Sequence, residues 1–170
     1  MWLHDHLIEV GKRCVGVDID EEAVKNVKAV TNIEDVYVAD VTQPGHAMIA
    51  GELWDVAVFA DVIEHVPDPG IFLKSFLDHY RSHVRAILIS IPNAQRIGMV
   101  KGAFGNFETI NSDHRCEYTP FTLCKLAIAA GLTPLEFHYV SYNEVSGLKR
   151  AFLNRFPRFS DGMIMLSVVQ

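Results

Sequence analysis

The sequence is poor in the features that mark membrane, secreted and nucleic-acid-binding proteins. No apolar run approaches the ~20 residues of a membrane span, and the N-terminus has no signal-peptide pattern. The 15 lysines and arginines are outnumbered by 21 aspartates and glutamates, so the chain lacks the basic face of a nucleic-acid-binding protein. Its three cysteines, Cys14, Cys116 and Cys124, form no C-x-x-C pair and no even framework. We therefore expect buried free thiols in a reduced, cytoplasmic protein that binds neither nucleic acid nor a membrane.

The chain also contains no internal repeat, no low-complexity tract and no linker. Its 170 residues are a single-domain length, and 49% of them are hydrophobic, enough to fill a sizeable core. We expect one domain over residues 1–170.

Strand-like and helix-like segments alternate along the chain. Apolar residues at helical spacing predict a helix over residues 2–10, ended by Gly11. The remaining pattern predicts strands near 14–18, 35–40, 54–61, 84–92, 133–141 and 162–169, and helices opened by Asp20, Asp68 and Thr119. Such alternation is typical of an α/β fold with right-handed βαβ units and a mainly parallel sheet that has helices on both faces.

Two regions depart from regular alternation. No clear full-length helix separates the last two predicted strands, so we expect them to be antiparallel. Residues 93–118 are long for a connection in a compact domain, and they include Phe104 and Phe107 among glycines. This stretch is predicted to be either a hinged cover over a small substrate or a surface loop with two anchoring aromatics.

Aspartates end the first three predicted strands of the alternating part. Because ligands of parallel sheets bind outside the carboxyl ends of the strands, Asp18, Asp40 and Asp61 should lie along one rim. A carboxylate has two acceptor oxygens and a ribose has two adjacent hydroxyl donors, so Asp18 suits a ribose. Asp40 could then accept from the exocyclic amine of a nucleoside. Either residue alone would be explained as a strand end that begins a turn, but the pair favours a nucleoside.

The spacing of these acids does not separate a nicotinamide dehydrogenase from a methyltransferase, whereas the next segment does. WDVAVFADVIEHVPDPGIFL, residues 54–73, resembles the fourth-strand signature of class I S-adenosylmethionine-dependent methyltransferases. Further segments resemble, in order, the second, third and fifth strands and the helix before the closing hairpin in the small-molecule branch of that family: CVGVDIDEEAV, VYVADVTQP, ISIPN and DHRCEYTPFTLCKLAIAAGL. The resemblance covers nearly the whole chain. It implies a Rossmann-like fold and S-adenosylmethionine as the cofactor.

The resemblance also assigns residues to the cofactor. It makes Asp18 the ribose ligand, Asp40 the adenine-amine ligand, Val41 a backbone donor to the adenine ring, Ile19 an apolar contact on the adenine face, and Ala60 and Asp61 the border of the methionine part.

One part of the family pattern is missing. The first strand and its E/D-x-G-x-G-x-G loop should precede residues 2–10, so we interpret the chain as starting after that loop. The family strand order 3-2-1-4-5-7-6 would place the missing strand between segments 14–18 and 54–61. Direct pairing of these two segments, a strand donated by a second chain in a homodimer, or further residues upstream would fill the gap, and we expect one of the first two.

Methyl transfer needs mainly alignment of the two reactants, but a hydroxyl or acidic-carbon acceptor also needs a base. His65, on the turn after residues 54–61, is the candidate base because histidine titrates near neutral pH, and Glu64 is a weaker candidate. A turn residue that packs over the start of the next helix explains His65 equally well. His114 could line the substrate pocket, although loop anchoring is the simpler interpretation. No metal is expected, because no third ligand beside Glu64 and His65 is evident.

The sequence therefore predicts an enzyme that transfers a methyl group from S-adenosylmethionine to a small-molecule acceptor. The first alternative is a methyltransferase-like module without catalysis, which serves binding or assembly. A nicotinamide oxidoreductase is the second alternative.

Overall fold

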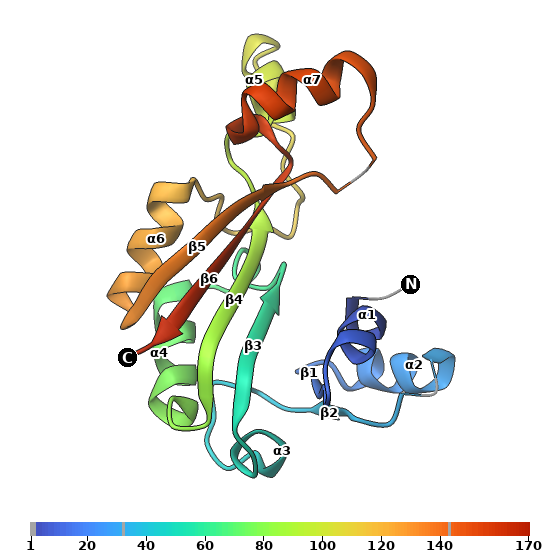
Figure 1. Ribbon diagram of the computed structural model, residues 1–170, viewed down its shortest axis with the longest axis vertical. Helices are drawn as coiled ribbons and strands as arrows, with labels where there is room; N and C mark the ends of the chain where they lie inside the picture. The colour runs from blue at the N-terminus through green and yellow to red at the C-terminus, as the bar shows by residue number, and fades with distance from the viewer. Residues whose placement is uncertain (1–2, 32, 143) are drawn as a thin grey trace. The chain divides into compact units, whose positions relative to one another are not determined.

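The computed structural model describes residues 3–31, 33–142 and 144–170. It consists of two compact units, Met1–Glu52 and Leu53–Gln170 (Figure 1). None of the helices in these described ranges is long and apolar enough to cross a membrane. A single domain over the whole chain stays a prediction.

The first unit is a small βαβ arrangement preceded by a helix. Helix α1 (Leu3–Val10) confirms the helix predicted over 2–10, apart from residue 2, which lies outside the described residues. Strand β1 (Gly16–Asp18) pairs in parallel with β2 (Val36–Val38), and α2 (Glu21–Thr31) connects them. Asp20 caps α2 as predicted, because its carboxylate accepts from the Glu22 amide at 2.8 Å and the Ala23 amide at 3.3 Å. The short helix α3 (Ala47–Ala50) was not predicted.

The second unit is built on a four-stranded sheet in the order β3-β4-β6-β5. Strands β3 (Trp54–Ala60) and β4 (Val84–Pro92) are parallel, whereas β6 (Gly162–Val169) is antiparallel to both β4 and β5 (Leu132–Val140). The predicted antiparallel closing hairpin is thus confirmed. Helices α4 (Pro69–Tyr80) and α6 (Pro120–Ala129) lie beside one another along the sheet (Figure 1).

The core of this unit and the starts of its helices follow from the sequence. Phe59 on β3 packs edge-to-face on Phe76 of α4, with ring centroids 5.1 Å apart. The Asp68 carboxylate accepts from the Ile71 amide at 2.9 Å and so begins α4, and Thr119 forms a capping box with Thr122 at the start of α6. Deeply buried residues come from the strands, from the inner faces of these helices and from the turn after β3: Ile63, Leu73, Leu77, Ile87, Ile89, Leu123, Met163 and Met165.

The direct pairing expected between segments 14–18 and 54–61 stays a prediction, because these segments belong to different units. Within the first unit β1 pairs with β2, and within the second unit β3 pairs with β4. Within segment 14–18 only the three residues Gly16–Asp18 are in strand conformation, so the ladder between β1 and β2 is short. Strand β3 is an edge strand of its four-stranded sheet, and its residue Val56 is 41% exposed. A homodimer with a donated strand stays a prediction.

Two further helices lack start signals in the sequence. Helix α5 (Ile97–Phe104) lies within the stretch predicted to be irregular, and Arg96 before it provides no side-chain cap. Helix α7 (Gly147–Arg155) and the 3-10 turn η1 (Pro157–Phe159) lie between β5 and β6, where no full helix was expected. The three cysteines are free thiols as predicted, but each is only partly buried.

Candidate functional site

Asp18 and Asp40 lie at the same end of the two-stranded sheet. Asp18 pairs in register with Val38, so Asp40 follows two residues beyond that pair. The Asp18 side chain is exposed, and its Oδ1 accepts from the Asp20 amide at 2.8 Å. The turn therefore uses one carboxylate oxygen, and a ribose would use the other. This position suits the predicted role of Asp18, which stays a prediction. The predicted roles of Val41 and Ile19 also stay predictions, and the Ile19 side chain is 71% exposed.

Asp40 is held in its ionised form by Thr42. Its Oδ1 accepts from the Thr42 hydroxyl at 2.6 Å and from the Thr42 amide at 2.9 Å. These hydrogen bonds lower the pKa of Asp40 below its ordinary value of 3.8. Asp40 is thus a charged acceptor at neutral pH, as recognition of an exocyclic amine requires.

The lowered pKa of Asp40 has a consequence for stability. Because the folded-state pKa lies below the unfolded value, the contribution of Asp40 is present above pH 3.8 and is lost as the pH falls through the folded-state pKa. Thermal melts should therefore show that Asp40→Asn lowers the melting temperature at pH 7, and that the difference from the wild type shrinks as the pH falls below 3.8. A difference that does not change with pH would mean that the charge on Asp40 is not what stabilises this turn.

The turn after β3 carries the remaining predicted site residues. Ala60 is the last residue of β3, and Asp61 adopts a left-handed backbone conformation with φ of 51°. The amide of Asp61 donates to the Ser90 carbonyl at 3.0 Å, and its carboxylate accepts from the Ser90 hydroxyl at 3.3 Å. A left-handed backbone at a non-glycine residue persists only when its surroundings hold it, so this turn has a fixed shape.

Glu64 is the most unusual residue of the turn. Its side chain is only 1% exposed, and neither carboxylate oxygen has a hydrogen-bond partner among the residues that the structure describes. Burial raises the pKa of Glu64 above its ordinary value of 4.5. Burial of an acid without a partner costs folding free energy. We therefore treat Glu64 as a candidate functional residue and not as a residue that serves the fold alone.

His65 and His114 meet beside Glu64. The two imidazole rings pack edge to face with centroids 4.8 Å apart. One ligand atom from each of Glu64, His65 and His114 lies within 4.8 Å of the other two. The loop that carries His114 is tied to the turn, because the Arg115 amide donates to the Glu64 carbonyl at 2.7 Å.

Hydrogen bonds behind the two histidines fix their ring orientation. His65 Nδ1 lies 3.2 Å from the Asp113 carbonyl oxygen, an acceptor, so Nδ1 carries the proton. His114 Nδ1 lies 3.3 Å from Oε1 of Glu117, and Oε2 of the same carboxylate accepts from Arg96 at 2.7 Å. Both Nε2 atoms therefore keep their lone pairs, for a proton or for a cation. The carboxylate behind His114 was not identified from the sequence.

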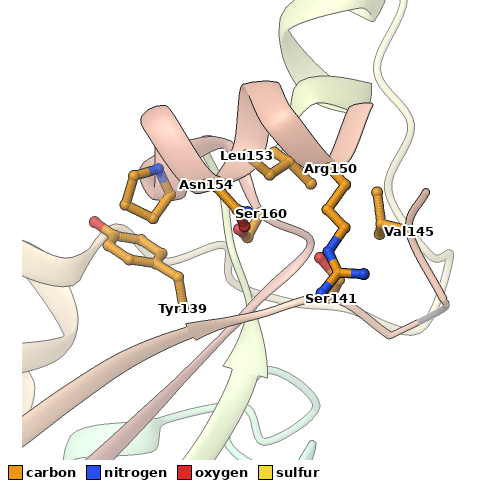
Figure 2. Close-up of a pocket in the computed structure, with 8 residues that line it drawn as sticks. Tyr139, Ser141, Val145, Arg150, Leu153, Asn154 and Ser160 are labelled. Atoms are coloured by element: carbon orange, nitrogen blue, oxygen red, sulfur yellow. The ribbon is translucent and has the colours of Figure 1, made fainter. Parts of the chain in front are cut away.

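Cavities border this end of the second unit. One, of about 660 Å³, is lined by His65, Ser112, Asp113, His114 and Arg115. Another, of about 440 Å³, is lined by residues of β5, α7, η1 and their connections: Tyr139, Ser141, Val145, Arg150, Leu153, Asn154, Pro157 and Ser160. Figure 2 shows Arg150, Leu153 and Asn154 of α7 across from Tyr139 and Ser141. This second cavity could not be found from the sequence, because α7 was not predicted.

Residues 2–136 match a protein family described as a methyltransferase domain. The chain belongs to this methyltransferase family. A ubiquinone biosynthesis O-methyltransferase of Aeromonas salmonicida (strain A449) is 26% identical over 152 residues, which cover 85% of the chain and 63% of that relative. The chain thus spans less than two thirds of the length of this curated relative.

Solved structures of methyltransferases share the fold. One is an S-adenosylmethionine-dependent methyltransferase from Clostridium acetobutylicum ATCC 824, with a TM-score of 0.62, 12% identity, and coverage of 98% of the chain and 79% of that structure. Another is the magnesium protoporphyrin IX methyltransferase of Synechocystis PCC 6803 with bound S-adenosylhomocysteine, with a TM-score of 0.60, 17% identity, and coverage of 99% and 69%. The small RNA methyltransferase HEN1 matches with a TM-score of 0.63 and 18% identity over 92% of the chain and 20% of that structure.

The predicted methyltransferase family and Rossmann-like α/β fold are confirmed, and S-adenosylmethionine is the cofactor of this methyltransferase family. The acids at the strand ends fit that cofactor, because Asp18 keeps a carboxylate oxygen beyond its turn and Asp40 is ionised. Which residues of this chain hold the cofactor stays a prediction.

Proposed function

We propose that this methyltransferase transfers a methyl group from S-adenosylmethionine to the hydroxyl oxygen of a small molecule. The observation that carries the proposal is the pair of oriented imidazoles at Glu64, in a cavity at the end of β3. The Aeromonas relative is named as an O-methyltransferase, which agrees with a hydroxyl acceptor. An RNA acceptor, suggested by one structural neighbour, is less compatible with a net charge of -6. The cytoplasmic location and the homodimer belong to the same proposal.

In this proposal the residues at the strand ends bind the cofactor, and the acceptor binds beside His65. Asp18 would hold the ribose, with Ile19 against the adenine, while Asp40 and the Val41 amide would bind the adenine edge. Ala60 and Asp61, on the fixed turn after β3, would border the methionine part. S-adenosylmethionine supplies, when bound, a methyl group activated on a sulfonium.

The chemical step then needs one proton acceptor. The hydroxyl proton of the acceptor passes to His65 Nε2, which the hydrogen bond of Nδ1 to Asp113 leaves free. The O–CH₃ bond forms as the S–CH₃ bond breaks, and S-adenosylhomocysteine leaves without the positive charge. Glu64, next to His65, stabilises the imidazolium that results.

Replacement of Asp18 tests the cofactor half of the proposal. Asp18→Ala removes the ribose acceptors, and a hydrogen bond to a charged group contributes ~1.5–3 kcal/mol. Calorimetric titration should therefore show that the affinity for S-adenosylhomocysteine falls by roughly tenfold or more.

Glu34→Ala is the matched control, because Glu34 is an exposed acid before the other end of β2. Equal affinity in the wild type and in Asp18→Ala would refute the ribose assignment. If the wild type binds NAD in preference to S-adenosylhomocysteine, the oxidoreductase is favoured. If the wild type binds S-adenosylhomocysteine but transfers no methyl group, the non-catalytic module is favoured.

A further inference from the structure

We propose that Glu64, His65 and His114 form a binding site for a divalent transition-metal ion. The sequence showed only two of these ligands, and the fold brings the third from a distant loop. Two ligands at ~2.1 Å from one ion lie at most ~4.2 Å apart. The cluster, whose atoms lie within 4.8 Å of one another, therefore needs to contract only slightly around an ion.

The burial of Glu64 is the first argument for a cation. The carboxylate is 1% exposed, and no described residue forms a hydrogen bond to either of its oxygens. Protonation would remove the charge, but it would leave an O–H group and a carbonyl oxygen without partners. A bound cation compensates the charge and coordinates an oxygen at the same time.

The hydrogen bonds behind the histidines are a second, independent argument. In metal sites, an imidazole ligand usually donates its other ring N–H to a carboxylate or a backbone carbonyl, which fixes the ring. His114 has the carboxylate of Glu117 at 3.3 Å, and His65 has the carbonyl of Asp113 at 3.2 Å. Arg96 holds Glu117 in place at 2.7 Å, so the arrangement is rigid behind the ligand that the sequence missed.

The ligand set indicates the class of ion. Two imidazoles and one carboxylate suit Zn²⁺, Fe²⁺, Co²⁺ or Ni²⁺, whereas Mg²⁺ and Ca²⁺ prefer sites made of oxygen ligands. Three protein ligands leave at least one coordination position open, as in catalytic zinc sites. His65 and His114 also line the cavity of about 660 Å³, so an acceptor oxygen could take that position.

A metal ion would also change how the acceptor is activated. This role rests on the proposed function, whereas metal binding itself does not. The ion would lower the pKa of a bound hydroxyl, and His65 would then act as a ligand and not as the base.

Calorimetric titration of the chelator-treated 170-residue chain with ZnCl₂ tests the site. We expect one tight site in the wild type, and a loss of tenfold or more in affinity in His114→Ala and in Glu64→Gln. Glu117→Gln, which removes only the carboxylate behind His114, should weaken Zn²⁺ binding by ~10–100-fold. Circular dichroism of each variant verifies that it is folded, and Co²⁺ absorption spectra report the coordination geometry.

His138→Ala is the matched control. His138 is an exposed histidine that lies 3.3 Å from a carboxylate oxygen of Glu136 on the same strand, and its loss should leave Zn²⁺ affinity unchanged. Weak Zn²⁺ binding that is the same in the wild type and in all four variants would overturn the proposal. It would show that only surface histidines and thiols bind the ion. Zn²⁺ binding without methyl transfer would refute the proposed function alone. Methyl transfer that survives full removal of metal would refute the role of the ion in activation.

Discussion

His65→Ala is expected to slow methyl transfer to a hydroxyl acceptor by ~10²–10⁴-fold while it leaves the affinity for S-adenosylhomocysteine within about twofold. The reason is that both versions of the proposed mechanism need Nε2 of this imidazole, either as the base or as a ligand of the metal ion that activates the acceptor. Its Nδ1 is already used by the Asp113 carbonyl at 3.2 Å. Single-turnover rates with labelled S-adenosylmethionine measure the chemical step, and calorimetry measures cofactor affinity.

The two versions of the mechanism differ in what else changes the rate. If His65 is the base, chelators should have no effect on the rate. If His65 is a metal ligand, chelation of the wild type should reproduce the defect of His65→Ala, and Zn²⁺ should restore the wild type only. His138→Ala should match the wild type in both assays. Parallel losses of cofactor affinity and rate in His65→Ala would instead assign this residue to the packing of the turn.

The part of the site that could be predicted is the part that is local in sequence. The turn V-x-E-H-x-x-D-P carries its own start signal, since Asp68 caps α4 and Pro69 occupies the first helical position. Glu64 and His65 could therefore be placed at the end of β3 without a structure. The acids Asp18 and Asp40 could be placed by the same reasoning, because Asp18 is the last residue of one short strand and Asp40 follows another.

His114 could be named from the sequence as a possible pocket residue, but its position beside Glu64 and its carboxylate partner Glu117 could not be found in this way. Hydrogen bonds from the Arg115 and Cys116 amides to the Glu64 carbonyl bring this loop to the turn, and no periodic pattern encodes such a contact. The same holds for α5 and α7. Helix α5 contains Gly98 and Gly102, and α7 begins at Gly147 with φ of 58°. Glycine has low helix propensity, so tertiary contacts and not local sequence decide these helices.

Asn93 shows how such tertiary contacts can be tested. The segment ISIPN resembles a strand of the family, but its sequence alone assigns no role to Asn93. Asn93 is fully buried, and its amide nitrogen donates to the Arg158 carbonyl at 2.8 Å and to the Ser160 carbonyl at 2.9 Å. Its side-chain oxygen accepts from the Gln95 amide at 2.9 Å. One side chain thus joins the end of β4 to the segment between α7 and β6.

Asn93→Ala should therefore be among the most destabilising single substitutions in the second unit. It removes all three hydrogen bonds and leaves two carbonyls and one amide to find other partners, each at ~1–3 kcal/mol if buried. We expect the free energy of unfolding to fall by about 3 kcal/mol or more, a large part of the ~5–15 kcal/mol that a domain has. Urea denaturation followed by circular dichroism measures this change.

Asn154→Ala is the control, because Asn154 is an exposed asparagine of α7 that lines the cavity of about 440 Å³. Its loss should change the free energy of unfolding by less than about 0.5 kcal/mol. The Arg96 guanidinium also donates to the Asn93 carbonyl at 3.1 Å and to Glu117 behind His114. If β4 loosens at this point, Asn93→Ala should weaken Zn²⁺ binding as well, although the hydrogen bonds of the Asn93 side chain go to Arg158, Ser160 and Gln95 and not to the three ligands. A variant with wild-type stability would show that water replaces the lost amide, and that the α7 segment is held by other contacts.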